Sequence, residues 1–398
     1  MSELETRLAE WLRASGATIR DHRRALHEIP ERGYEEHETS AYLQRALASL
    51  GIGTVPVAGT GLVAELPGSG EGPTVMLRSD MDGLPIAEDE SHEPRSRRPG
   101  FMHACGHDGH MSILLGVADA VAGALGDERL PGRLLLLFQP AEESSAGAAR
   151  VVEEGTLERH GVDYVLGLHL WSFLEKGRAI VPDGTVMASA DEFRVVLKGK
   201  GGHGALPHEA RDVVVCLSHL VLALQGIVSR EIDPLQPAVL SIGRIRAGDA
   251  ANVLPERGEL FGTFRAPNAR VRGQILRRIG EMAEAVGKTH DIEAEVEFGT
   301  GYPPTVNDAA VAGLLRSAAA DVLGAPGALP GPQTMAAEDF AMYLQRRPGA
   351  FMLLGMRDEA AGIVHPHHCA QFQVAEDVLP LGAEILLRGA LRVMQSRP

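Results

Sequence analysis

Three imidazoles, a thiol and a carboxylate fall within nine residues of this 398-residue chain, at positions 102–110. Cys105 and His107 are separated by one glycine, so both side chains can reach one small volume. A cysteine thiolate and a neutral imidazole are common donors to zinc-like ions. The spacing therefore indicates a metal site, and the apolar run 111–125 predicts a helix directly after it.

Ligand-type side chains recur at four further places, most of them at or just after a strand-like apolar run: Asp80 and Asp82, Glu142 and Glu143, His169, and His365, His367 and His368. Taken singly, the glutamates could begin a solvated helix, and His169 could be a core histidine. Asp108 and His110 could likewise cap a helix or lie on the surface. The carboxyl ends of parallel strands meet at one edge of a sheet, which favours a shared catalytic site.

The simplest function that would use all of these groups is that of a two-metal hydrolase. Two divalent ions about 3.5–4 Å apart can share a hydroxide and polarise a carbonyl oxygen. The adjacent pair Glu142 and Glu143 suits this chemistry, because one can bind metal while its neighbour acts as general base. Asp82 is expected to orient a metal ligand without binding the metal itself.

Composition and charge exclude several other classes. The chain is 44% hydrophobic and 23% charged, as a globular protein is, and its net charge of −15 with no basic block argues against nucleic acid or an anionic membrane as partner. We expect no membrane span and, from the acidic N-terminus without an apolar signal core, a cytoplasmic protein. The three cysteines do not make a disulfide framework, and Cys216 is predicted to be a small buried hydrophobe.

Outside residues 187–298, the sequence pattern predicts an α/β fold with a mainly parallel sheet. Two helices are expected in the first 50 residues, after which strand and helix signals alternate. The predicted strands are 74–78, 133–138 and 164–169, and the predicted helices are 111–125, 146–154, 309–323 and 378–395.

The character of the chain changes near residue 187, where apolar and polar residues begin to alternate. The order from there is β-α-β-β-α-β, with strands 191–198, 239–245, 259–265 and 292–298 and helices 212–228 and 270–286. This order is that of a ferredoxin-like α+β unit. We therefore predict an inserted domain at 187–298 and a discontinuous catalytic domain at 1–186 and 299–398.

Seven ordered motifs resemble one family of di-metal amidohydrolases. They are RSDMDGLP (78–85), HACGHDGH (103–110), FQPAEE (138–143), GLHLW (167–171), GKGGHGALPH (199–208), ANVLP (251–255) and AEDF (337–340). The family includes hippurate hydrolases, N-acyl-amino-acid amidohydrolases and plant auxin-conjugate hydrolases, and is related to aminoacylase. The resemblance runs from about His22 to Asp377.

The resemblance implies a catalytic domain with an inserted lid that often mediates dimerisation. By motif, the metals would be held by Cys105 as the bridging ligand and by His107, Glu143, His169 and a C-terminal histidine. Glu142 would be the general base, and His203 of the lid would stabilise the oxyanion, in relatives at the site of the partner subunit. Asn252 and Arg265 are lid candidates for holding the substrate carboxylate.

The C-terminal motif departs from the family pattern and reads His-Pro-His-His-Cys before Ala-Gln-Phe. Counting four back from Phe372 selects His368 as the ligand, with His367 as the fallback. Cys369 replaces a small or polar residue and is expected to pack, with a redox liability or an extra soft donor as the other possibilities.

We therefore expect metal-dependent hydrolysis of N-acyl amino acids, with hippurate-like or N-acetyl substrates, by a homodimer or a dimer-based oligomer. Two divalent ions are expected, and Zn, Mn, Co and Ni all suit the donors. The alternatives are a dipeptidase or carboxypeptidase on the same scaffold and a non-catalytic metal-binding homologue. Signatures of nucleobase deaminases, helical zinc proteases and serine hydrolases are absent from the sequence.

Overall fold

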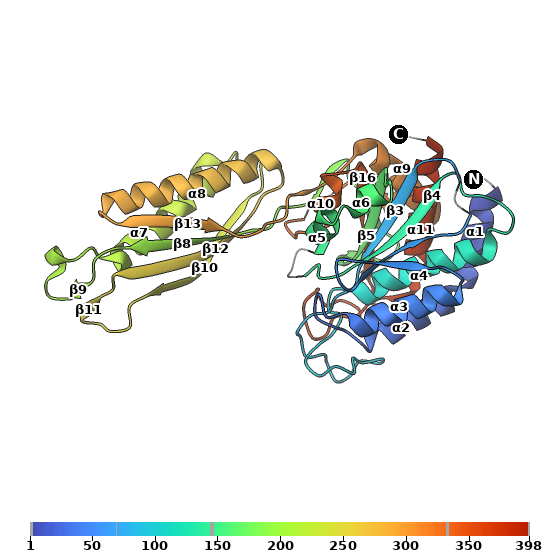
Figure 1. Cartoon of the computed structure of the whole chain (residues 1–398), viewed down its shortest axis with the longest axis horizontal. Coiled ribbons are helices and arrows are strands. Elements are labelled where there is room, and N and C mark those ends of the chain that lie inside the picture. The colour runs from blue at the N-terminus through green and yellow to red at the C-terminus, as the bar shows by residue number, and fades with distance from the viewer. Residues whose placement is uncertain (1–2, 69, 144–146, 332–333, 397–398) are drawn as a thin grey trace. The chain divides into compact units, whose positions relative to one another are not determined.

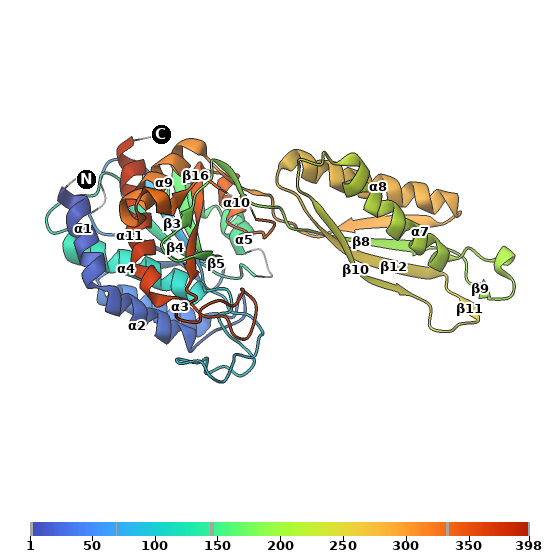
Figure 2. The ribbon, with the colours of Figure 1, turned by 180° about the vertical axis from the view of Figure 1, so that it is seen from behind.

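The structure is a computed structural model that describes residues 3–68, 70–143, 147–331 and 334–396. The chain forms two compact units, each with its own apolar core (Figures 1 and 2). The first unit takes the described residues of 1–186, 306–332 and 339–398, and the second takes those of 187–305 and 333–338.

The helices of the first unit are α1 (Glu3–Ala14), α2 (Gly16–His27), α3 (His37–Ser49), α4 (His107–Ala124), α5 (Gly147–Glu153), α6 (Thr156–Arg159), α9 (Ala309–Leu323), α10 (Ala341–Leu344) and α11 (Leu379–Ser396). Its strands are β1 (Thr54–Val57), β2 (Gly61–Glu65), β3 (Thr74–Asp80), β4 (Arg133–Gln139), β5 (Tyr164–Glu175), β6 (Ala179–Ile180), β15 (Ala328–Leu329) and β16 (Gly349–Arg357). The short strands β7 (Gly184–Met187) and β14 (Thr305–Asn307) form a separate two-stranded sheet.

The eight strands of the first unit form one sheet in the order β1-β2-β4-β3-β5-β16-β6-β15. Its four central strands, β4, β3, β5 and β16, are parallel, so their carboxyl ends lie at one edge. Leu166, Leu168 and Leu170 of β5 join the core that includes α4 and α11, whereas Gly167 points the other way and lies against Phe340, ahead of α10. The predicted α/β architecture is confirmed.

Two parts of this unit were not predicted from the sequence. The central strand β16 is a continuous apolar run, buried from Gly349 to Met356, and such a run does not by periodicity distinguish a strand from a buried helix. The N-terminal segment forms three helices rather than two, because the chain turns at Ser15 between α1 and α2.

The second unit contains β8 (Asp191–Lys198), α7 (Val213–Gly226), β10 (Val239–Ala247), β12 (Arg257–Arg265), α8 (Ala269–Thr289) and β13 (Glu293–Phe298). The strands form an antiparallel sheet in the order β10-β12-β8-β13, and both helices share its core. Asp212 and Asn268 begin the two helices by accepting backbone N–H bonds. A short pair, β9 (Gly202–His203) and β11 (Val253–Leu254), completes the predicted α+β unit.

Helix α7 continues as a π-helical turn, so that Val213–Glu231 forms one helical segment that is long and apolar enough to cross a membrane by composition alone. No such segment was predicted from the sequence. A third (33%) of the apolar window is buried, and core helices of soluble proteins pass the same test. Cys216 on this helix is fully buried, as predicted.

Candidate metal centre

Four elements of the first unit bring the predicted ligands to one edge of the sheet. Cys105 precedes α4, whose first residue is His107, and Gly106 between them adopts a left-handed φ of 85° that lets the chain turn sharply. Glu143 follows β4, and His169 lies on β5. His368 lies in the loop after β16, where its backbone N–H donates to the Ala104 carbonyl at 2.9 Å.

The donor atoms of these five residues lie close together. The Cys105 Sγ atom is 3.4 Å from His169 Nε2 and 3.3 Å from His368 Nε2. Glu143 Oε1 is 3.2 Å from His368 Nε2 and 3.7 Å from His107 Nε2. Within each of the triads Cys105/His107/His169 and Cys105/Glu143/His368, the donor atoms lie within 4.8 Å of one another. The structure therefore brings together the five residues predicted as metal ligands.

Two of the imidazoles are oriented by bonds on their other nitrogen. The Nδ1–H of His169 donates to the Leu170 carbonyl at 2.6 Å, and that of His107 donates to the Asp82 carbonyl at 2.9 Å. Each bond fixes the tautomer and leaves Nε2 free to act as a donor to metal.

The charge balance of the cluster fits a cation. His107 Nε2 is buried without a hydrogen-bond partner among the described residues. Burial lowers the pKa of His107, but Asp80, Asp82 and Glu143 outweigh it and raise the pKa to about 10. Burial, with Glu143, Glu142 and Asp80, raises the pKa of the Cys105 thiol well above its ordinary value. Divalent ions would offset this excess negative charge and deprotonate both groups.

Two neighbouring histidines are already fully hydrogen-bonded. The Nδ1–H of His110 donates to Asp80 at 2.7 Å, and its Nε2 accepts the Leu170 N–H at 2.9 Å. His367 bonds the Ser172 hydroxyl through Nδ1 and the Leu170 carbonyl through Nε2, both at 2.9 Å. Burial lowers the pKa of His367 to about 4, so it is neutral. Of the two C-terminal candidates, only His368 directs a ring nitrogen at the cluster.

Asp82 holds the turn that carries the two glutamates. Its Oδ1 accepts the Glu142 N–H at 3.1 Å, and its Oδ2 accepts the Glu143 N–H at 3.1 Å. The Glu142 side chain is 8% exposed, and its Oε1 lies 3.5 Å from the Asp339 N–H. A buried carboxylate beside the cluster is suited to accept and return a proton.

A buried ionic network lies next to the cluster, and of its members only Asp80 was predicted from the sequence as a candidate ligand. The Arg78 guanidinium donates to Asp80 at 2.9 Å, to Asp339 at 2.8 Å and to Gln139 at 2.8 Å. Asp339 also accepts bonds from Gln139 and the Ala148 N–H. Asp339 belongs to the AEDF motif, and this motif is the sequence feature that could have identified it as a site residue. The network fixes Asp80, whose other oxygen holds His110.

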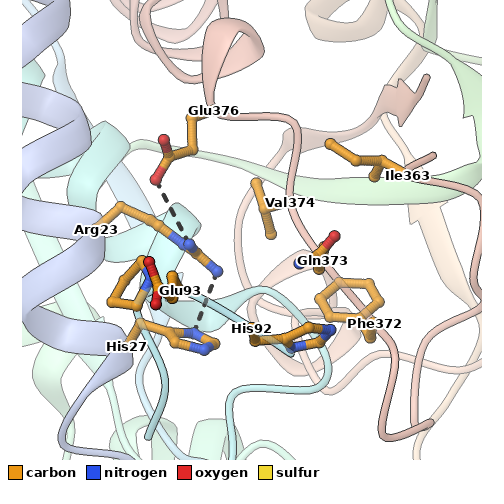
Figure 3. Close-up of a pocket in the computed structure, with 10 residues that line it drawn as sticks. Arg23, His27, His92, Glu93, Ile363, Phe372, Gln373, Val374 and Glu376 are labelled. Atoms are coloured by element: carbon orange, nitrogen blue, oxygen red, sulfur yellow. Dashed lines mark hydrogen bonds and ion pairs between the residues drawn. The ribbon is translucent and has the colours of Figure 1, made fainter. Parts of the chain in front are cut away.

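A second network supports the start of α4 beside a cavity of about 200 Å³ (Figure 3). Arg23 and His27 both lie 2.8 Å from Asp108, the residue after His107. Figure 3 shows Arg23 between His27 and Glu376 on the cavity wall. Burial and Arg23 lower the pKa of His27, but hydrogen bonds to Asp108 and Glu88 outweigh them and raise it.

The remaining predicted residues lie in the second unit. His203 of β9 pairs with Val253 of β11, and the Gly204 N–H bonds the Asn252 carbonyl, so His203 and Asn252 are neighbours. Arg265 ends β12, and burial lowers its pKa. The structure does not bring Arg265 to Asn252. The half-exposed Cys369 bonds the Pro366 carbonyl through its Sγ atom.

Comparison with known proteins identifies the family. Residues 76–392 match the model of peptidase family M20/M25/M40. The chain is 39% identical over 379 residues to N-acetyl-L-cysteine deacetylase of Bacillus subtilis (strain 168), with 94% of this chain and 88% of the relative covered. It is also 39% identical over 377 residues to IAA-amino acid hydrolase ILR1-like 5 of Arabidopsis thaliana, with coverages of 94% and 86%.

Among solved structures, the Bacillus subtilis YXEP protein, described as a dinuclear metal binding peptidase from the M20 family, is similar at a TM-score of 0.83. The two sequences are 30% identical, and the match covers 96% of this chain and 99% of that one. The chain therefore belongs to peptidase family M20/M25/M40 and is a metal-dependent amidohydrolase.

Proposed function

We propose that this amidohydrolase cleaves the amide bond of N-acyl amino acids, hippurate-like or N-acetyl, and releases a carboxylate and a free amino acid. The observation that carries the proposal is that His107 Nε2 is buried without a hydrogen-bond partner among the described residues and faces Glu143 Oε1 at 3.7 Å, beside a buried thiol. Two divalent ions, of Zn, Mn, Co or Ni, would be held by Cys105, His107, Glu143, His169 and His368. Cys105 would be a ligand common to the His169 and His368 sides of the cluster, because its Sγ atom lies next to both of these histidines.

When bound, such ions supply Lewis acidity for the amide carbonyl and lower the pKa of a water molecule. The chain contributes the proton transfers. Glu142 would take a proton from the attacking water and deliver it to the leaving nitrogen. Asp82 would keep Glu142 and Glu143 in place through their backbone N–H groups.

The second unit offers substrate contacts at its two ends. Phe264, next to Arg265, pairs with Asp191, the first residue of β8, whereas His203 and Asn252 lie beyond the other end of β12. The nine residues of β12 span roughly 26 Å at about 3.3 Å per residue, so one substrate carboxylate cannot reach both Arg265 and Asn252 of one subunit. We propose that Arg265, on the one hand, and His203 and Asn252, on the other, contact the substrates of two different subunits of a dimer.

The surface of the second unit supports this homodimer. Leu222 on α7 is 71% exposed, and β10 is an edge strand on which Ile245 is 50% exposed. An unpaired strand edge can extend its hydrogen bonding into a second copy. A partner covering α7 would bury its exposed apolar side chains in the dimer. We therefore propose that α7 is an interface helix rather than a membrane span, in agreement with the expected cytoplasmic enzyme.

The test is hydrolysis of N-acetyl and N-benzoyl amino acids, with dipeptides and peptides as the competing substrate class, after reconstitution with each metal in turn. The Glu142→Gln variant should keep its metal and lose activity by a factor of about 10² to 10⁴. Glu153→Gln, an exposed glutamate on α5, is the matched control. Full activity of Glu142→Gln would refute the assignment of the base, and preference for peptides would favour the peptidase alternative.

A further inference from the structure

The turn at residues 141–143 carries both the proposed base and a proposed ligand, and it is held in an unusual way. Three consecutive backbone N–H groups each donate to a buried carboxylate: that of Ala141 to Glu36 at 2.9 Å, and those of Glu142 and Glu143 to Asp82 at 3.1 Å. Ala141 also adopts a positive φ of 55°, which an alanine rarely does without external support.

The buried side chain of Glu36 links this turn to a neighbouring segment of the chain. It immediately precedes α3, its side chain is 0% exposed, and its second oxygen accepts a hydrogen bond from the Thr60 hydroxyl. The backbone beside it is in direct contact with the turn, since a Cβ atom added to Gly33 would lie 2.8 Å from both Cα and Cβ of Ala141. The turn is therefore fixed by Asp82 from one segment and by Glu36 from another.

We propose that Glu36 is a positioning residue for amide hydrolysis: by binding the Ala141 N–H, it sets the direction in which Glu142 and Glu143 enter the site. The proposal rests on the proposed function of Glu142 and Glu143. Without Glu36, Ala141 loses its N–H acceptor and can relax from the positive φ, which moves the next two side chains. A displacement of about 1 Å at reacting groups can reduce turnover about 100-fold.

The experiment compares Glu36→Ala with Glu36→Gln and uses Glu35→Ala, an exposed glutamate one position earlier, as the control. Glutamine keeps an oxygen for the Ala141 N–H, and the Thr60 hydroxyl can accept from its amide. We expect Glu36→Ala to lose about 10- to 100-fold in kcat with little change in KM. Glu36→Gln should stay within about threefold of the wild type, and Glu35→Ala should be unchanged.

A second readout separates this proposal from the proposed function. Metal-stripped proteins are titrated with Co²⁺ and followed by absorption, which needs no substrate, and Glu36→Ala should bind it more weakly than Glu36→Gln does. If Glu36→Ala does not fold, Thr60→Val takes its place, because it removes the hydroxyl that donates to Glu36 and should lower kcat and Co²⁺ affinity in the same direction by a smaller factor. Wild-type kcat and Co²⁺ binding in Thr60→Val would then overturn the positioning role.

Two outcomes would overturn the positioning role. One is a folded Glu36→Ala with wild-type kcat and Co²⁺ binding. The other is a folded Glu36→Gln as impaired as Glu36→Ala. A wild-type protein that binds Co²⁺ but cleaves no N-acyl amino acid would contradict the proposed function alone.

Discussion

Replacing Asp82 by asparagine should lower turnover and metal affinity together in a protein that remains folded. The two carboxylate oxygens of Asp82 accept different backbone N–H groups, those of Glu142 and Glu143. Asparagine has one acceptor oxygen, so its NH₂ group would face one of these donors. The variant must therefore lose one hydrogen bond to a charged acceptor and leave a buried N–H unpaired.

The size of the effect follows from this geometry. A hydrogen bond to a charged group contributes about 1.5–3 kcal/mol, and about 1.4 kcal/mol corresponds to a factor of ten, so the loss should be roughly 10- to 100-fold. Glu143 is a proposed ligand and Glu142 the proposed base, so the loss should be divided between metal affinity and kcat, with KM little changed.

The assay measures kcat and KM on an N-acetyl amino acid and the affinity of the stripped protein for Zn²⁺. Asp308→Asn is the matched control, because Asp308 also accepts two backbone N–H groups, at the start of α9. Asparagine and aspartate are equally good at such a helix start, so this control should be unaffected. Wild-type kcat and Zn²⁺ affinity in Asp82→Asn would refute the reasoning.

Four further predictions follow from the structure. Arg78→Met leaves Asp80 and Asp339 buried without their guanidinium partner and should lower the urea unfolding free energy by about 3–5 kcal/mol, whereas the exposed control Arg346→Met should not; a loss below about 1 kcal/mol would contradict the network. Burial raises the pKa of Glu36 from the ordinary 4.5 to about 7, so the native state holds this proton more tightly than the unfolded state does, and stability present below pH 4.5 is lost as the pH rises through 7. Glu36→Gln lacks this titration and should therefore be more stable than the wild type at pH 8 by up to about 3 kcal/mol, with equal stabilities at pH 8 as the opposing result. Chelation should lower the melting temperature and Zn²⁺ should restore it, because the cluster binds ions only in the folded state; a metal-independent melting temperature would argue against the cluster. Leu222→Glu on α7 should yield a monomer in light scattering while Leu235→Glu, in a loop of the same unit, should not, and a dimeric Leu222→Glu would remove α7 from the interface.

The local pattern predicted those parts of the fold and site whose signal is contained in a short segment. The spacing Cys-Gly-His and the adjacent glutamates at the end of an apolar run indicated the cluster, because parallel strands bring such ends to one edge. The β-α-β-β-α-β order of the second unit is likewise a local signal. In contrast, the strand β16 has an apolar run that fits helix and strand equally, so its central place in the sheet was missed.

The supporting groups were not predictable, because their partners are far away in the sequence. Arg78 and Asp339 are separated by 261 positions, and no local spacing links them. His110 has the spacing of a ligand, but its second nitrogen accepts the distant Leu170 N–H, which no local pattern indicates. Glu36 lies in an ordinary acidic segment, and only the positive φ of Ala141, 105 positions later, shows what it supports.

The surroundings of Cys105 bear on how the protein withstands oxidants during purification. Peroxide and alkylating agents react with thiolates, whereas burial among carboxylates keeps this sulfur protonated once the ions are stripped away. The half-exposed Cys369 is therefore the first position at which oxidative damage should accumulate during storage. A preparation stripped with chelator should remain fully reloadable for as long as the chain stays folded.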